Sequence, residues 1–282
     1  MKIGFNLLLW TTNLKSKDFH LLEKLKKTGF DGVEVPIFEG SPESYNNISV
    51  QLKNLGLACT GISVIPDEEH NPISSNKTNR NKAKDFLKWA VDCNHALNSK
   101  IMSGPFHQPL GQFSGFPPTI IEKQNGSEVH KEVANYAKNY GIILCIEPLN
   151  RFECYFLNTI KDTYDYVKLV NEDNFKILYD TFHANIEEKN PIESLSKFSD
   201  KIGHIHISEN DRGTPGKGNI PWGETFKTIK MINYQGWLTM EAFGRSLPDL
   251  AAATKVWRDF FTSDEEVYKE GFCFIKNNLY KL

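Results

Sequence analysis

Short apolar runs alternate with longer amphipathic stretches along the whole chain, and this alternation constrains the fold more than any other feature. The apolar runs have the length and patterning of β-strands, and the stretches between them carry apolar residues at helical spacing. We expect strands at residues 2–8, 31–36, 59–64, 100–104, 142–147, 175–180, 202–208 and 236–241. We expect helices at residues 17–28, 42–55, 79–97, 119–140, 160–171, 191–198, 222–233 and, as one or two helices, within 247–278.

Strand–helix units that repeat in this way predict a parallel sheet, and its closed form is the (β/α)8 TIM barrel. A doubly wound open sheet is the alternative. It fits less well because no GxGxxG or P-loop motif follows an early strand, and polar residues cluster at several strand tips. No composition break divides the chain, so we expect residues 1–282 to form a single α/β barrel domain.

Four of the expected strands end on a side chain that commonly binds metal ions. They carry Glu147 (IILCIEP), Asp180 (FKILYD), His206 (IGHIHI) and Glu241 (WLTME). The carboxyl ends of parallel barrel strands meet at one face, so these side chains are expected to hold a single divalent ion. Three carboxylates and one imidazole favour Mn²⁺, with Mg²⁺ or Co²⁺ as alternatives, over a thiolate-rich zinc site.

Each of these residues also has a structural interpretation. Asp180 could cap a following helix, and Glu241 could be one half of a buried ion pair. His204, two residues before His206 on the same face, is expected deeper in the barrel as a core or supporting group. A buried carboxylate without a cation is costly, however, and one metal ion would meet the needs of Glu147 and Glu241 together.

Several further residues are candidates for the substrate pocket. His183 follows Asp180 by three residues and lies within reach of a metal-bound ligand, and Phe243 is expected to form part of the pocket wall. Asn6 faces inward on the first strand, and His107 lies in a loop rich in glycine and proline. For His107, and for Glu34 near the tip of the second strand, a pocket role and a structural role are equal alternatives.

The segments EPLNRFE, YDTFHAN, GHIHISENDRGTPGKG and LTMEAFG together resemble the xylose-isomerase-like barrel superfamily, and specifically its ketose 3-epimerases of the D-tagatose/D-psicose type. The resemblance is close over the last four strands and looser over the rest. The N-terminal half departs from it, because those epimerases carry more aromatic residues around the far end of the sugar. This departure bears on the choice of sugar rather than on the reaction.

The resemblance implies a metal-dependent isomerase that interconverts C3 epimers of a free ketohexose or ketopentose through a cis-enediolate. It implies that Glu147 and Glu241 exchange acid and base roles while they bind the metal with Asp180 and His206. It also implies that Glu153, His183 and Arg212 contact the sugar. Such chemistry is consistent with carboxylates that flank a carbon next to a polarised carbonyl.

Other functions remain open from the sequence. An aldose–ketose isomerase of the hydroxypyruvate type would use the same metal and bases, and Lys217 keeps a phosphorylated pentulose substrate possible. Endonuclease IV-like DNA repair shares the barrel but uses three zinc ions held by a richer set of histidines and acids. Only 8 histidines occur here, and most lie away from the expected strand tips. A non-enzymatic sugar-binding protein is the remaining alternative, and the pair of glutamates argues against it.

Composition limits the partners and the compartment. A formal net charge of −2 without a prominent basic tract argues against nucleic acid as the main partner. The 5 cysteines show no CxxC spacing, which is typical of reduced thiols in a cytoplasmic protein. The N-terminal apolar run is too short to span a membrane and is expected to be a buried strand. We also expect a homo-oligomer, a dimer or a tetramer, for which Trp257, Phe260 and Phe261 are candidate contacts.

Overall fold

The computed structural model describes residues 1–280 and shows eight parallel strands that close into a barrel in the order β1 to β8. Every neighbouring pair is parallel, including β1 with β8, which completes the ring. The strands are β1 (Lys2–Asn6), β2 (Gly32–Pro36), β3 (Ala58–Ile62), β4 (Ile101–Gly104), β5 (Ile143–Ile146), β6 (Phe175–Asp180), β7 (Ile202–Ile207) and β8 (Trp237–Met240). The predicted (β/α)8 barrel is therefore confirmed.

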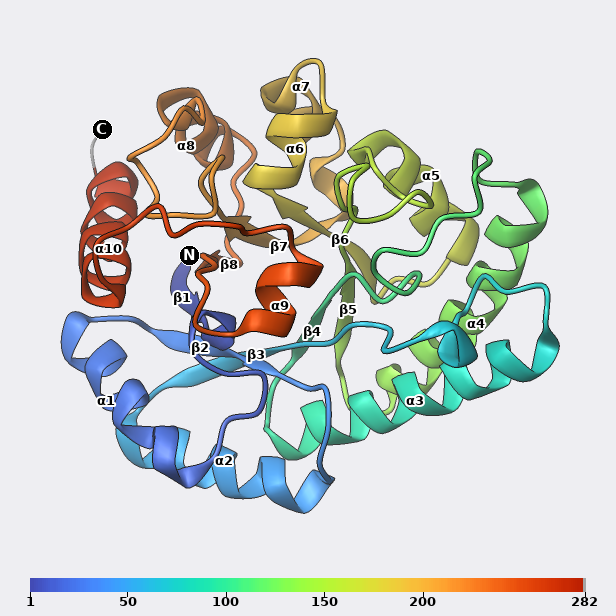
Figure 1. Ribbon diagram of the computed structural model, residues 1–282, viewed down its shortest axis with the longest axis horizontal. Helices are drawn as coiled ribbons and strands as arrows, with labels where there is room; N and C mark the ends of the chain where they lie inside the picture. The colour runs from blue at the N-terminus through green and yellow to red at the C-terminus, as the bar shows by residue number, and fades with distance from the viewer. Residues whose placement is uncertain (281–282) are drawn as a thin grey trace.

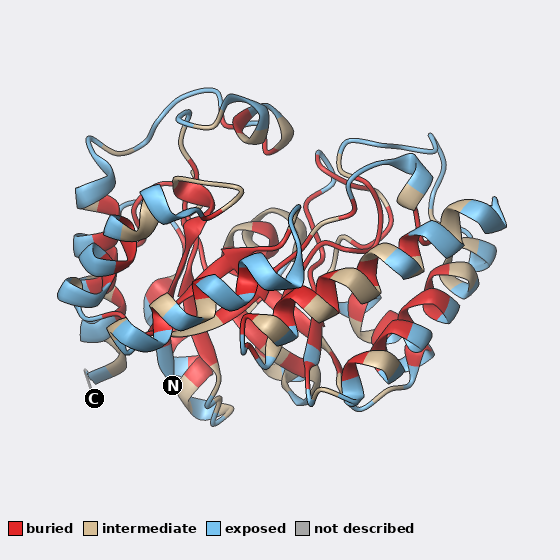
Figure 2. Ribbon diagram, turned by 90° about the horizontal axis from the view of Figure 1, so that it is seen from below, coloured by how far each residue is buried: buried red, intermediate tan, exposed pale blue. Residues whose placement is uncertain are grey.

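Helices surround this barrel and bury one face each against it, as the red inner and blue outer faces in Figure 2 show. They are α1 (Phe19–Thr28), α2 (Pro42–Leu55), α3 (Lys77–Ala96), α4 (Ile120–Lys138), α5 (Ile160–Val170), α6 (Thr181–Glu187), α7 (Pro191–Lys197), α8 (Trp222–Met231), α9 (Pro248–Ala253) and α10 (Asp264–Tyr280). In Figure 1, α9 lies in front of the barrel mouth, whereas α10 belongs to the outer ring. One large hydrophobic core fills the space between the helices and the strands.

Local sequence signals explain where the helices begin and end. Pro42 occupies the first turn of α2, and Gly56 ends it with φ +64°, a conformation that glycine adopts without strain. Thr119 caps α4 by accepting the backbone N–H of Glu122, whose carboxylate in return accepts the N–H of Thr119. Such caps fix the connections that set the strand tips in place.

The structure departs from the expected elements in two places that matter for the site. The first strand stops at Asn6 because its side-chain oxygen accepts the N–H of Leu8, which turns Leu7–Leu9 into a short 3-10 helix. An additional helix, α6, begins directly at Asp180, since the Asp180 carboxylate accepts the N–H groups of Phe182 and His183. The closing segment forms two helices, α9 and α10, as one of the expected alternatives.

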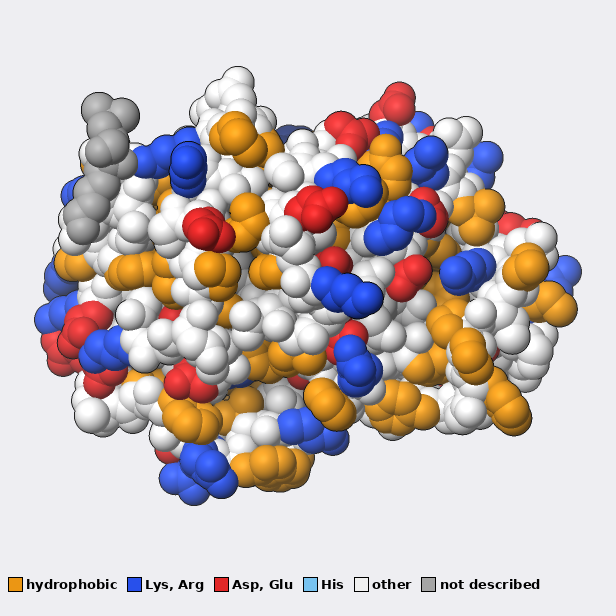
Figure 3. Space-filling view, turned by 90° about the horizontal axis from the view of Figure 1, so that it is seen from above, with side chains coloured by type: hydrophobic (Ala, Val, Ile, Leu, Met, Phe, Trp, Pro, Cys, Tyr) orange, Lys and Arg blue, Asp and Glu red, His pale blue; other side chains and the backbone are white. Residues whose placement is uncertain are grey.

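The distribution of charged side chains on the surface agrees with the small net charge of the sequence. In the view of Figure 3, lysines and arginines are interspersed with acidic side chains, and the basic residues do not form a continuous stripe across this face. Within residues 1–280 every helix is either too short or too polar to cross a membrane. The N-terminal apolar run is the buried strand β1, as predicted from its length.

Candidate metal centre and pocket

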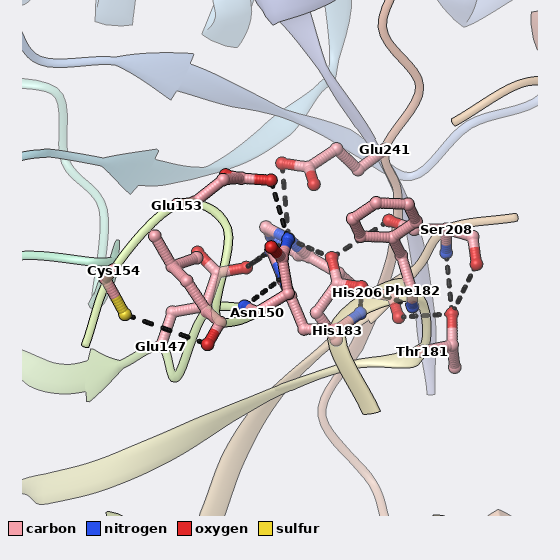
Figure 4. Close-up of polar contacts among 12 residues, drawn as sticks. Glu147, Asn150, Glu153, Cys154, Thr181, Phe182, His183, His206, Ser208 and Glu241 are labelled. Atoms are coloured by element: carbon pink, nitrogen blue, oxygen red, sulfur yellow. Dashed lines mark hydrogen bonds and ion pairs between the residues drawn. The ribbon is translucent and has the colours of Figure 1, made fainter. Parts of the chain in front are cut away.

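Four side chains from successive strands converge at the carboxyl end of the barrel. Glu147 directly follows β5, Asp180 ends β6, His206 lies near the end of β7, and Glu241 directly follows β8. All four are at most 3% exposed, and each offers a ligand atom within 4.8 Å of those of the others. Figure 4 shows Glu147, His206 and Glu241 pointing toward a common region. The predicted convergence of these residues is thus present in the structure.

The imidazole of His206 tests whether a metal ion fits this cluster. Its Nδ1 atom is buried without a hydrogen-bond partner and lies 3.8 Å from Glu147 Oε1, 3.5 Å from Asp180 Oδ2 and 3.4 Å from Glu241 Oε1. Ligands that surround one ion at bond lengths of about 2.1 Å are separated from each other by about 3.0–3.5 Å. The four side chains therefore fit a shared divalent cation with little movement.

Glu34 fixes the orientation of the His206 ring from below. Its Oε2 atom lies 2.7 Å from His206 Nε2, so Nε2 carries a proton that it donates to the carboxylate. Nδ1 then faces the cluster, where a bound metal ion would take the place of the Nδ1 proton. Glu34 Oε1 accepts from Thr60 and Ser103 and lies 2.9 Å from His204 Nε2. Of the two alternatives for Glu34, these contacts favour the structural role. His204 lies in the deeper layer of the barrel, as expected.

Asp180 performs both of the functions considered for it. Its Oδ1 atom accepts the N–H groups of Phe182 and His183 at the start of α6. Its Oδ2 atom accepts the hydroxyl of Ser208 at 2.9 Å and faces the His206 ring. The helix cap holds the carboxylate in place, and the second oxygen remains directed into the cluster.

The electrostatics of the cluster favour a cation. Burial raises the pKa of Glu147 well above its usual range; the negative charges of Glu241 and Asp180 add to this shift, while His206 opposes it. Burial also raises the pKa of Asp180, but His206 and the Arg212 guanidinium outweigh that effect and hold it well below its usual value. Three carboxylates thus share two positively charged neighbours, and a divalent ion would balance the charge.

Beside this cluster, Arg212, His183 and Glu153 form the polar part of a cavity of about 230 Å³. The backbone N–H of Asn150 donates to His183 Nδ1 at 2.9 Å, so the ring proton is on Nε2, which lies 3.0 Å from Arg212 Nη2. Two N–H donors therefore lie side by side at the cavity wall, and an oxygen atom bound next to them could accept from both. Glu153 Oε1 accepts from the Asn150 side chain at 2.7 Å and stays within 4.0 Å of Arg212.

Two phenylalanine rings hold the Arg212 side chain. Its guanidinium carbon lies 3.8 Å from the centroid of Phe182 and 4.7 Å from that of Phe243, and its Nη1 atom donates to Glu241 Oε2 at 2.6 Å. The backbone of Arg212 has φ +64°, a rare conformation for a non-glycine residue. Backbone strain of this kind often occurs at ligand-binding positions, where the surrounding contacts maintain it. Phe243 lines the cavity, as expected.

Two candidates for the substrate pocket, Asn6 and His107, contact the glutamates of the cluster. Neither side chain is exposed, and neither lines the cavity. The Asn6 amide donates to Glu241 at 2.9 Å and to Glu34 at 3.2 Å, and His107 Nε2 contacts the backbone oxygen of Glu147 at 3.0 Å. Both side chains therefore support the glutamates of the cluster, which for His107 agrees with the structural alternative.

Sequence reasoning missed three residues that shape this site. Asn150 sets the His183 tautomer, Phe182 stacks on Arg212, and Ser208 orients Asp180. Each lies within three residues of a predicted site residue, in the segments EPLN, DTFH and HIS. Their proximity to strand tips was the available signal, but the partners of a side chain cannot be read from its position alone.

The closed parallel barrel with a metal-type cluster at its carboxyl end defines a class of protein. Residues 22–277 match the xylose isomerase-like TIM barrel family, and the chain belongs to this family.

Individual relatives show which members of this family the chain resembles. The chain is 33% identical to the D-psicose 3-epimerase of Agrobacterium fabrum, over 92% of this chain and 91% of that protein. It is 31% identical to the D-psicose 3-epimerase of Ruminiclostridium cellulolyticum, over 94% of this chain and 92% of that protein. A crystal structure of D-psicose 3-epimerase with D-tagatose from Clostridium cellulolyticum H10 superposes with a TM-score of 0.90 at 28% identity, covering 99% of both chains. The predicted resemblance to ketose 3-epimerases is confirmed.

Proposed function

We propose that this protein is a divalent-metal-dependent ketose 3-epimerase that acts on a free ketohexose or ketopentose. The observation that carries this proposal is the placement of Glu147 and Glu241 in one cluster at the wall of one cavity. They follow β5 and β8, which are three strands apart in a closed ring of eight, so they approach the cavity from different sides. A C3 epimerase needs such a pair, because the proton leaves one face of the carbon and returns on the other.

Each side chain has a defined task in this proposal. One glutamate removes the proton from C3, and the electron pair of the broken C–H bond moves to the carbonyl oxygen O2, which forms the enediolate. The other glutamate then donates a proton to the opposite face of C3. Arg212 and His183 donate hydrogen bonds to the oxygen on which charge develops, and Glu153 orients the O1–O2 end of the sugar.

Glu147, Asp180, His206 and Glu241 would hold the metal ion. When bound, such an ion polarises the carbonyl and stabilises the negative charge of the enediolate. We propose Mn²⁺ because three carboxylates and one imidazole suit a borderline cation, with Mg²⁺ and Co²⁺ as alternatives.

A panel of ketoses tests the proposal. The protein is first treated with a chelator and then assayed with and without added Mn²⁺, and the products are separated by chromatography. A C3 epimer that appears only with metal supports the proposal. An aldose product would indicate the isomerase alternative, and sugar binding without turnover would indicate a non-enzymatic protein.

The structure weakens the phosphorylated alternative. Lys217 pairs with Glu266 at 2.8 Å and Glu270 at 2.9 Å, and it does not line the cavity. Arg212 is the one cationic side chain among the described residues of the cavity wall, and it is engaged by Glu241. A phosphate group would find no cluster of free positive charges here.

We also propose that the protein forms a homo-oligomer in the cytoplasm. Trp257 is 66% exposed and Phe260 is 46% exposed, which supports a contact surface at this segment, whereas Phe261 packs against the core. The 5 cysteines are all unpaired in the structure, in agreement with a reducing compartment. Light scattering after size exclusion gives the mass directly. If the Trp257→Ser, Phe260→Ser double variant has the same oligomeric mass as the wild type, this segment is not part of the subunit interface.

A further inference from the structure

The cavity wall divides into two halves of different chemistry. The loops that follow β5 to β8 supply all of its charged and imidazole side chains, which are described above. The segments that follow β1 to β4, together with α9, supply aliphatic and aromatic side chains, chiefly Leu8, Phe38, Ile62, Val64, Leu110 and Leu250. A bound sugar would therefore have one polar and one apolar end.

The apolar half is a packed structure of its own. Leu8, Ile62 and Phe243 form a hydrophobic cluster with Ala251 of α9 and Val256, and this cluster is separate from the main core. Phe38 and Leu250 pack against it. Helix α9 lies in front of the barrel in Figure 1, and its Leu250 and Ala253 line the cavity.

Hydroxyl groups of a sugar would find few partners at this end. Thr12 and Thr254 are the two hydroxyl-bearing side chains of the described cavity wall. Thr254 directly follows α9, and its hydroxyl already donates to the backbone oxygen of Leu250 in that helix at 2.8 Å. The hydroxyl of Ser63, next to Val64, donates to the backbone oxygen of Ile37 and is fully buried. A hydroxyl that is buried without a partner loses its hydrogen bonds to water, and this loss weakens binding.

We propose that the substrate is a ketose whose terminal carbon, at the end remote from the carbonyl, is a methyl group, as in a 6-deoxyketohexose. This inference rests on the proposed function, since the reacting O1–O3 end must occupy the polar half. The remaining carbons then extend toward Leu8, Ile62 and Leu250, where a methyl group gains apolar contacts and a hydroxymethyl group does not.

Matched sugar pairs that differ by one oxygen atom test this. We would compare D-fructose, L-fructose and L-tagatose with their 6-deoxy forms, using the Mn²⁺-loaded protein and measuring kcat/KM for C3 epimerisation. An apolar pocket rejects an added hydroxyl by up to about 100-fold, and we expect a preference of about tenfold for the deoxy sugars. A preference below about threefold in most pairs would overturn the inference. If no member of any pair is epimerised but the ketopentose L-ribulose is, the inference fails; if L-ribulose is not epimerised either, the proposed function itself fails.

Two substitutions add a hydrogen-bonding group to the apolar end. Val64→Thr and Leu250→Gln should each reduce the preference for the deoxy sugar, because the hydroxymethyl group then gains a partner. Val50→Thr is the matched control, since Val50 is 54% exposed on α2 and does not line the cavity. If the ratio of the two kcat/KM values is unchanged in both pocket variants, with wild-type circular dichroism, the apolar wall does not determine specificity.

Discussion

Replacement of Glu34 by Gln tests how the barrel prepares His206 for a metal ion. The substitution preserves shape but removes the negative charge, and the amide can present only one oxygen to the donors around it. Those donors are His206 Nε2 at 2.7 Å, Asn6 Nδ2 at 3.2 Å, Thr60 Oγ1 at 2.8 Å and Ser103 Oγ at 3.1 Å. The imidazole then loses the acceptor that fixes its tautomer and raises its basicity.

Loss of such a supporting carboxylate weakens metal affinity by about 10- to 100-fold, which corresponds to about 1.4–2.7 kcal/mol. Calorimetric titration of the chelator-treated protein with Mn²⁺ measures this directly, without any assay of turnover. Glu23→Gln, an exposed position on α1, is the matched control and should bind Mn²⁺ as the wild type does. A folded Glu34→Gln protein with wild-type Mn²⁺ affinity would refute this explanation of the His206 geometry.

The remaining predictions concern the reacting groups and acid stability. Glu147→Gln should lower kcat for epimerisation by at least about 100-fold while sugar binding persists, and unchanged turnover would remove Glu147 from the acid–base pair. Arg212→Lys should lower kcat/KM by about 100-fold, because lysine cannot stack flat between Phe182 and Phe243 while it donates to Glu241; activity near wild type would show that only the charge matters. Burial lowers the pKa of His130 to about 4, so the unfolded chain binds more protons between about pH 4 and 6.5, and stability should fall as the pH drops through this window. Urea unfolding at pH 4.5 and 7.5 should show a smaller loss for His130→Gln than for the wild type, and an equal loss would contradict this assignment.

The barrel and the four-residue cluster could be predicted because both depend on local patterns. Strand-length runs alternate with helices, and the strand tips of a parallel barrel must meet at one face. Glu147, Asp180, His206 and Glu241 each end a recognisable run, so their convergence follows from topology.

The supporting residues could not be predicted in the same way, because their roles depend on contacts between distant segments. Glu34 reaches His206 across 172 positions of sequence, and Asn6 reaches Glu241 across 235. Helix α6 was missed because a single residue, Asp180, both ends a strand and caps a helix. His107 lies in a loop expected at the pocket, but its ring turns toward the Glu147 backbone.

Deuterium incorporation from solvent tests the central claim most directly. The Mn²⁺-loaded protein is incubated with a ketose substrate in D2O, and the products are analysed by NMR. A base on one side and an acid on the other should place deuterium at C3 of the epimeric product and at no other carbon. Label at C1 or C2, or an aldose product, would show that the cluster formed by Glu147, Asp180, His206 and Glu241 performs a different proton transfer.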